Sequence, residues 1–304
     1  MTESNRVAVV IPTYNQADFL REALRSVIAQ DYGSWHVTVV NNFSTDHTRD
    51  VVREFADQRI EIVDFANKGV IAASRNLALR KATSKYVAFL DSDDWWHPRK
   101  LSRCVERLEQ GADLVCHAEE WKAPSFSRVV RYGPQRRLQY QSLLLGGNCL
   151  STSAIVGRTD MFKAVDGFSE RPDFITAEDY DLWLRLAHQN YRFDLIDDVL
   201  GTFRIHSASA SSSIARNSAA EMAVARAHLE AGQFSRRTIR RRIGRSHYGA
   251  ARAFHSAGDY SSARKRFLSS MRLAPVFPRT YVGLAITLLH SPRKQDARTH
   301  GAQR

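Results

Sequence analysis

Cysteine is scarce in this chain of 304 residues, which has three. Cys104, Cys116 and Cys149 are too few and too scattered for a disulfide framework or a zinc cluster, so a reducing cytosol is the expected compartment. No apolar run reaches the roughly 18 residues that a membrane-spanning helix needs; the longest candidate, residues 281–289, falls well short. The N-terminus enters a strand pattern without the apolar region of a signal peptide, so we expect a cytoplasmic protein.

Glycine-rich phosphate loops are also missing. Neither a Gly-x-Gly-x-x-Gly pattern nor a Walker-type loop occurs in the chain, which argues against dinucleotide dehydrogenases and P-loop enzymes. A nucleotidyltransferase with a similar sheet is an alternative. It would need a basic, glycine-rich loop after the first strand to hold a triphosphate, and residues 12–15 (PTYN) are a poor substitute.

Acidic residues are almost absent from the end of the chain. Residues 236–304 contain 16 Lys or Arg and 2 Asp or Glu, whereas residues 1–235 contain 28 and 30. The net charge of +12 therefore belongs to the C-terminal tail and not to the chain as a whole. A basic tail on an otherwise neutral chain is a weak argument for a nucleic-acid partner, and we predict none.

Strand and helix patterns alternate over the first 115 residues. Short apolar runs typical of buried strands occupy residues 6–12, 35–41, 60–65, 86–90 and 113–117, and helical patterns occupy residues 20–28, 46–55, 69–81 and 98–110. This alternation predicts an α/β fold with a doubly wound, mostly parallel sheet flanked by helices. Beyond about residue 118 the alternation breaks down, and the chain from about residue 216 to 290 is predicted to be helical.

Polar residues follow three of these strands, at residues 13–15, 41–44 and 91–93. In a parallel sheet, ligands bind beyond the carboxyl ends of the strands. Asp91, Asp93 and Asp94 directly follow an apolar strand, and carboxylates so close together repel unless a cation lies between them. Mg²⁺ or Mn²⁺ carrying a diphosphate would satisfy them. The alternative is a solvated acidic turn that caps the next helix.

Several short motifs occur together in a specific order. They are VVIPTYN (9–15), VVNNFSTD (39–46), NKG (67–69), SRN (74–76), LDSDD (90–94), EDYDLWLR (178–185) and FRIH (203–206). Over residues 6–213 the chain resembles the family 2 glycosyltransferases, which have the GT-A fold. The resemblance implies a nucleotide-diphosphate sugar donor, Mg²⁺ or Mn²⁺, inversion at the anomeric carbon, and a glycan or lipid-linked acceptor in polysaccharide or cell-envelope biosynthesis.

The resemblance also assigns roles to residues of this chain. The residues that would bind the nucleotide sugar are Pro12, Thr13, Tyr14, Asn15, Asn41, Arg75, Asp91 and Ser92. The metal would be held by Asp93, Asp91 and His206, although a histidine at a strand end is as often structural. Arg75 has the alternative of pairing only with Asp91 or Asp94. Asn41 stands where the family usually has an aspartate, so a charge-assisted contact to a uracil base is lost.

Proton removal is assigned by the same resemblance to the start of the EDYDLWLR helix. Asp179 would be the general base, with the adjacent Glu178 as the alternative. Trp183 is expected to belong to the core. A non-catalytic nucleotide-sugar-binding or scaffold protein is a further alternative. It is disfavoured because a scaffold has no need of Asp91, Asp93 and Asp179 together.

The C-terminal tail resembles one tetratricopeptide repeat over residues 247–275. We therefore expect a glycosyltransferase domain at residues 1–213, a helical connector at 214–245 and a basic helical tail at 246–304. Basic and apolar side chains of this tail could contact an anionic membrane at the inner face of the cell membrane: Arg264, Lys265, Arg266, Arg272, Phe277, Tyr281, Leu284 and Leu288. The alternative is a solvated helical face.

Overall fold

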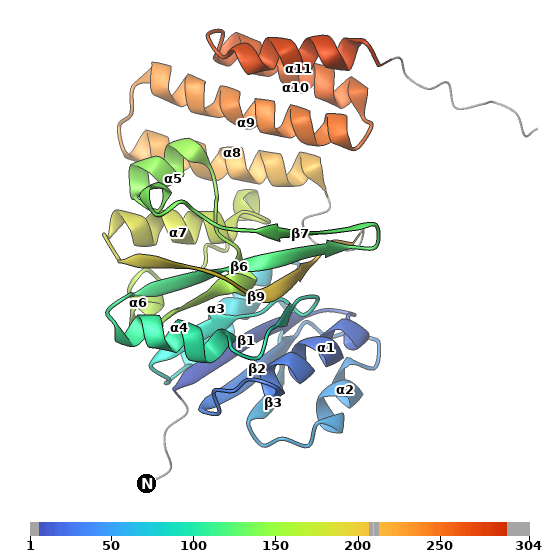
Figure 1. Cartoon of the computed structure of the whole chain (residues 1–304), viewed down its shortest axis with the longest axis vertical. Coiled ribbons are helices and arrows are strands. Elements are labelled where there is room, and N and C mark those ends of the chain that lie inside the picture. Colours follow the sequence, from blue (N-terminus) through green and yellow to red (C-terminus); the bar gives the residue numbers. More distant parts are fainter. Residues whose placement is uncertain (1–5, 207–208, 210–212, 291–304) are drawn as a thin grey trace, which may run out of the picture. The chain divides into compact units, whose positions relative to one another are not determined.

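A nine-stranded mixed sheet forms the centre of the first part of the chain in this computed structural model, which describes residues 6–206, 209 and 213–290 (Figure 1). Its strands are β1 (Val7–Thr13), β2 (Trp35–Asn41), β3 (Ile60–Asp64), β4 (Tyr86–Phe89), β5 (Trp95–Trp96), β6 (Leu114–Ala123), β7 (Phe126–Val130), β8 (Ile155–Arg158) and β9 (Phe193–Arg204). Their order is β3-β2-β1-β4-β8-β6-β9-β5, and β7 pairs with β6. The expectation about a signal peptide falls mainly on residues 1–5, which lie outside the described residues.

The first four strands are all parallel, with β1 between β2 and β4 and with β2 paired to β3. This confirms the predicted α/β fold. The sheet continues in a way that the alternating pattern does not indicate: β8 lies between β4 and β6 and is antiparallel to both. The next neighbour of β4 therefore comes from the stretch in which the sequence alternation has broken down. Parallel pairing returns between β6 and β9.

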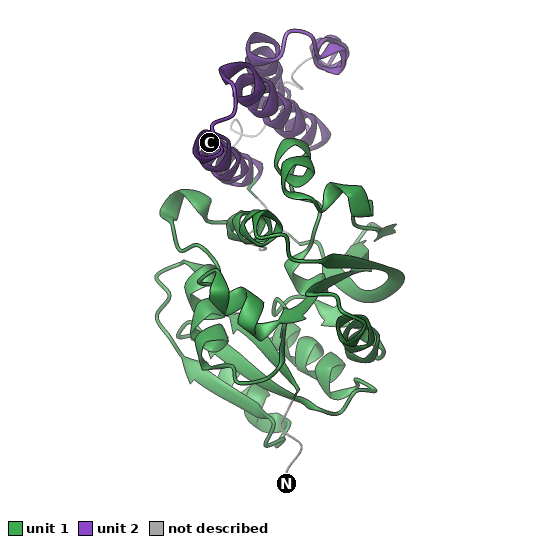
Figure 2. Cartoon of the chain, turned by 90° about the vertical axis from the view of Figure 1, so that its left-hand side faces the viewer, with its two compact units in different colours: residues 1–213 green, residues 214–304 purple. Residues whose placement is uncertain are grey.

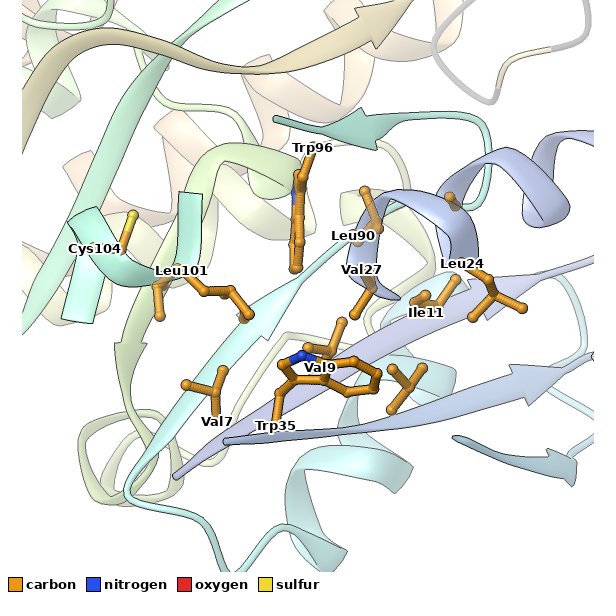
Figure 3. Close-up of a cluster of buried hydrophobic side chains, with 14 of the residues drawn as sticks. Val7, Val9, Ile11, Leu24, Val27, Trp35, Leu90, Trp96, Leu101 and Cys104 are labelled. Atoms are coloured by element: carbon orange, nitrogen blue, oxygen red, sulfur yellow. The ribbon is translucent and has the colours of Figure 1, made fainter. Parts of the chain in front are cut away.

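Helices cover the sheet, and apolar side chains fill the space between these layers. The helices are α1 (Ala17–Ile28), α2 (Thr48–Glu54), α3 (Ile71–Lys81), α4 (Lys100–Glu109), α5 (Tyr140–Gly146), α6 (Thr159–Ala164) and α7 (Glu178–His188), with short 3₁₀ turns η1 (Gln135–Arg137), η2 (Thr152–Ala154) and η3 (Pro172–Phe174). Every residue of β1 is buried, as in a central strand covered on both faces. Figure 3 shows Trp35 of β2 beside Val9 of β1, below Val27 of α1.

The chain divides into two compact units, residues 1–213 and 214–304 (Figure 2). The second unit contains α8 (Ile214–Ala231), α9 (Arg236–Ser256), α10 (Tyr260–Leu273) and α11 (Pro278–Leu288). Helix α9 runs without a break through residues 245 and 246, so the expected limit of the connector lies inside a helix. A small core of Ala251, Ala263 and Phe267 joins α9 to α10. The likeness to a tetratricopeptide repeat stays a prediction.

Candidate active site

The loops after β1 and β2 are joined by hydrogen bonds at the carboxyl edge of the sheet. The backbone N–H of Asn15 donates to Oγ of Ser44 (2.9 Å), and the N–H of Thr45 donates to Oδ1 of Asn15 (2.8 Å). Asn15 has a φ of 50°, a left-handed conformation that asparagine tolerates better than most residues. Two of the three predicted loops are thus held as one surface.

The side chains on this surface differ in their exposure and in the hydrogen bonds that they already make. Tyr14 is exposed, whereas Pro12 and Thr13 are buried at the end of β1. The hydroxyl of Thr13 has no hydrogen-bond partner among the described residues. The amide of Asn41 is engaged at both ends, because Nδ2 donates to Asp64 (2.7 Å) and Oδ1 accepts from the N–H of Ser44 (3.0 Å). In this structure Asn41 therefore shapes the loop.

The acidic turn after β4 is fixed from several sides. Ser92 is buried and donates from Oγ to Oε1 of Gln16 (2.5 Å), which ties the turn to the loop after β1. Asp94 is also buried; it accepts from Oγ of Ser153 in η2 (2.5 Å) and from the N–H of Arg204 in β9 (2.8 Å). Burial, followed by the charges of neighbouring carboxylates, raises the pKa of Asp94 well above its ordinary value. Asp94 therefore holds the turn together.

Asp93 meets His206 across the carboxyl edge. Oδ2 of Asp93 and Nε2 of His206 lie 2.8 Å apart, at hydrogen-bond distance, and the imidazole packs on Phe19 with ring centroids 5.0 Å apart. Burial and the charge of Asp91 raise the pKa of Asp93, while the contact with His206 opposes that rise. Residues 113 positions apart thus form one polar pair, which sequence spacing alone does not show.

Asp93 and His206 provide two of the ligands that a divalent cation needs. Mg²⁺ usually binds one or two carboxylates and completes its shell with substrate phosphates and water. Asp93 and His206 supply an oxygen and a nitrogen side by side. Burial and then the charge of Asp91 raise the pKa of Asp93, and a cation would favour its ionised form. The third predicted ligand, Asp91, is turned toward Arg75. Within the described chain, no three His, Cys, Asp or Glu residues are grouped so that they could hold a metal alone.

Arg75 is the buried cation of the site. Its Nη2 donates to Asp91 (2.5 Å) and its Nη1 donates to Glu178 (2.8 Å), so one guanidinium joins the β4 turn to the start of α7. Burial acts to lower the pKa of Arg75, but the charges of Asp91 and Glu178 outweigh it and raise the pKa above its ordinary value. Of the two partners suggested by the sequence, Asp91 and Asp94, Arg75 pairs with Asp91. Its second partner, Glu178, is a contact that sequence analysis missed.

Glu178 and Asp179 have different surroundings although they are adjacent. Glu178 is buried and accepts from Arg75 and from the N–H of Thr176 (2.8 Å). Asp179 is half-buried; its Oδ2 accepts from Nδ2 of Asn148 (3.2 Å) and Oγ1 of Thr152 (3.4 Å). Burial, and then the charge of Glu178, raises the pKa of Asp179 to about 7. Asp179 therefore has the pKa of a group that exchanges protons near neutral pH.

Three supporting residues were missed because they come from the stretch without sequence periodicity. Ser153 donates to Asp94, and its Oγ also accepts from the N–H of Asp91 (3.1 Å). Asn148 and Thr152 contact Asp179. The Gly-Gly-Asn sequence at residues 146–148, before η2, was the only sequence pattern that marked this stretch. Trp183, in contrast, is fully buried and belongs to the core as predicted.

Comparison with known proteins identifies the family. The model of the family described as "Glycosyl transferase family 2" matches residues 8–165, which is more than half of the chain and includes the β1, β2 and β4 loops. The chain belongs to glycosyltransferase family 2. It is therefore a glycosyltransferase, and its relatives include enzymes named for cell-envelope polysaccharide biosynthesis.

Two relatives show how similar this glycosyltransferase is to proteins of the family. A putative teichuronic acid biosynthesis glycosyltransferase, TuaG of Bacillus subtilis, is 29% identical over 211 residues, which cover 68% of this chain and 81% of TuaG. A UDP-Glc:alpha-D-GlcNAc-diphosphoundecaprenol beta-1,3-glucosyltransferase, WfgD of Escherichia coli, is 30% identical over 186 residues, which cover 60% of this chain and 70% of WfgD.

Solved structures agree on the fold. S. aureus TarS 1–349 in complex with UDP-GlcNAc superposes with a TM-score of 0.64 at 19% identity and covers 93% of this chain and 89% of its own. The mannosyltransferase PcManGT from Pyrobaculum calidifontis, in complex with GDP-Man and Mn²⁺, gives a TM-score of 0.59 at 21% identity and covers 95% and 86%. At these identities the likeness establishes the GT-A fold alone.

Proposed function

We propose that this glycosyltransferase is metal-dependent and inverting, and that it transfers a sugar from a nucleotide diphosphate to a hydroxyl of a glycan or lipid-linked acceptor. The observation that carries the proposal is that two polar groups of different character lie at the carboxyl edge of the sheet. Asp93 and His206 form a polar pair on one side, Asp179 has a pKa near 7 on the other, and Arg75 joins their loops.

The donor side is assigned to the loops after β1 and β4. Thr13 and Tyr14 would bind the nucleoside, since the buried Thr13 hydroxyl lacks a partner in the described structure and Tyr14 is exposed beside it. Asp93 and His206 would hold Mg²⁺ or Mn²⁺. Asp91 lies two residues from Asp93 and is paired with Arg75. A bound divalent cation supplies stabilisation of the negative charge that develops on a departing diphosphate.

The acceptor side is assigned to Asp179. Its carboxylate would take the proton from the acceptor hydroxyl while that oxygen forms a bond to the anomeric carbon. The bond from this carbon to the diphosphate oxygen breaks on the opposite face, so the configuration inverts. We assign the base to Asp179 and not to Glu178, because Glu178 already accepts from Arg75 and from the Thr176 N–H. General-base catalysis of this kind contributes about 10²- to 10⁴-fold in rate.

We further propose a lipid-linked acceptor and a site of action at the inner face of the cell membrane. The support is the word diphosphoundecaprenol in the names of WfgD and WfaP, to which the chain is 30% and 27% identical. No helix in residues 6–206 or 213–290 is long and apolar enough to cross a bilayer.

The experiment that tests the proposed function is donor turnover by the full chain. Purified protein is incubated with a panel of UDP-, GDP-, dTDP- and CDP-sugars, with Mn²⁺ or with EDTA, and released nucleotide is measured. We expect turnover of at least one donor with Mn²⁺, its loss with EDTA, and a higher Mn²⁺ requirement in Asp93→Asn. Equal turnover in EDTA would refute the metal assignment, and no turnover of any donor would refute the donor class.

A further inference from the structure

Helix α11 is turned so that its polar and small residues face inward. Thr280 and Thr287 are fully buried. The hydroxyls of Thr280 and of Ser270 in α10 lie 3.0 Å apart, and Thr287 donates to the carbonyl of Gly283 (2.7 Å). Gly283 lies against Phe267, where an added Cβ would come within 2.6 Å of the ring. Small residues and paired hydroxyls therefore attach α11 to α10, and little of the large apolar surface of α11 is used for this contact.

The opposite face of α11 is apolar and exposed. Its large side chains recur at helical spacing, with exposed fractions of 44% for Tyr281, 60% for Val282, 46% for Ile286, 58% for Leu288 and 84% for Leu289. In Figure 1, α10 and α11 lie on the side of α9 away from α8, at the end of this helical unit. A helix that buries threonine and exposes leucine needs an apolar environment on its outer side.

Two of the apolar residues named from the sequence do not belong to this outer face. Leu284 packs on the core of Ala251, Ala263 and Phe267, and the ring of Phe277 contacts Tyr248 with centroids 5.0 Å apart. The face is instead Tyr281, Val282, Ile286, Leu288 and Leu289, and we call it the α11 face. Its definition required the structure, because the sequence of α11 is apolar over most of its circumference.

Positive charge lies at both ends of the α11 face. Residues 260–290 contain no Asp or Glu and carry Arg264, Lys265, Arg266, Arg272 and Arg279. Arg279 is exposed in the first turn of α11, and Arg264 donates to the carbonyl of His290 (2.8 Å) just beyond the last turn. A cation therefore lies at each end of the apolar face, and no carboxylate of α10 or α11 opposes an anionic surface.

We propose that the α11 face docks this glycosyltransferase on an anionic lipid bilayer, with the apolar side chains at the level of the acyl boundary and the basic side chains on the headgroups. The use of such docking rests on the proposed lipid-linked acceptor. Residues 291–304 contain no Val, Leu, Ile, Met, Phe, Tyr or Trp, so they offer no large apolar side chain to cover the α11 face. The charge pattern favours lipid over a second copy of the chain, whose corresponding face would be equally positive.

Vesicle flotation of the full chain tests this proposal. Vesicles of phosphatidylcholine with phosphatidylglycerol are compared with phosphatidylcholine alone, for the wild type, the double variant Val282→Asp with Ile286→Asp, and the control Val129→Asp. Val129 is an exposed valine of β7, so the control makes the same kind of change outside the helical unit that contains α11. Circular dichroism melts check that each variant is folded, and nucleotide release from the panel of nucleotide sugars with Mn²⁺ is measured in parallel.

We expect the wild type and Val129→Asp to float with anionic vesicles and the double variant to bind about tenfold or more weakly, since two aliphatic side chains leave the lipid. Equal binding of the double variant, or no preference for anionic lipid, would overturn the proposal. So would a wild-type dimer that the double variant converts to a monomer, which would identify a second copy as the occupant. Because flotation does not require turnover, a failure of the proposed function would appear only in the nucleotide-release assay.

Discussion

Replacing Asp179 by Asn should abolish transfer and, at the same time, stabilise the folded protein above neutral pH. The pKa of this carboxyl is raised from 3.8 to about 7, first by burial and then by the charge of Glu178. A raised carboxyl pKa means that the folded state holds the proton more tightly than the unfolded chain. Ionised Asp179 therefore costs stability, and this cost grows as the pH rises from about 4 to about 7.

The magnitude follows from the size of this difference. At about 1.4 kcal/mol per pH unit, a pKa of about 7 in place of 3.8 corresponds to about 4 kcal/mol at pH 8. Part of the Asp179 side chain reaches solvent, so we expect about half of this, or about 2 kcal/mol. Asparagine is uncharged at every pH and keeps an oxygen for the Tyr180 N–H. The variant should thus unfold at about 4–8 °C higher temperature at pH 8 and show no gain at pH 4.

Ionisation of Asp179 should lower the stability of the wild type but raise its catalytic activity. A general base works when it is deprotonated, so kcat/KM should rise about tenfold between pH 6 and pH 8 if Asp179 titrates near 7. In Asp179→Asn, kcat should fall about 10²- to 10⁴-fold while the donor still binds. The assays are nucleotide release across this pH range and thermal unfolding at pH 4 and pH 8.

Asp173→Asn is the matched control, because Asp173 is an exposed carboxylate of the nearby turn η3 whose pKa is lowered by its hydrogen bond with Arg171. It should keep full activity and gain no stability at pH 8. If Asp179→Asn keeps the kcat of the wild type, Asp179 is not the base. If its melting temperature at pH 8 does not exceed that of the wild type, the carboxylate is not destabilised by burial as argued here.

Two further predictions concern the groups that hold the site together. Arg75→Ala leaves Asp91 and Glu178 without their buried cation and should lower the free energy of unfolding by about 3–5 kcal/mol in urea titrations; a loss below about 1 kcal/mol would show that the two carboxylates find other partners. Ser153→Ala removes the donor to Asp94 and should cost about 1–3 kcal/mol and raise the Mn²⁺ concentration for half-maximal turnover. An unchanged Mn²⁺ requirement would show that the β4 turn keeps its shape without this hydroxyl.

Local sequence patterns predicted the parallel half of the sheet well, because each of those strands carries its own apolar run and a helix follows it. The position of β8 could not be predicted this way. Residues 155–158 read as an ordinary short apolar segment, and only tertiary pairing places them between β4 and β6. Ser153 enters the site with that strand, so its contacts with Asp91 and Asp94 were equally invisible.

The directions in which side chains point were the second feature that the sequence could not predict. The motif at residues 178–185 identified two neighbouring carboxylates, and either could have been the base. Their difference arises from Arg75, which lies 103 positions away from Glu178 in the sequence. The same limit applies to α11, whose sequence is apolar over most of the circumference and does not say which side faces Phe267.

Arg75 gives the neighbouring carboxylates of the site different surroundings. Its two Nη groups donate to Asp91 and Glu178, so one buried guanidinium pairs with both carboxylates. Asp179 receives two neutral donors from Asn148 and Thr152, and the charge of Glu178 raises its pKa more than the charge of Arg75 lowers it. Arg75 also links the β4 turn to α7. One buried guanidinium thus joins the proposed donor side to the helix that carries the proposed base.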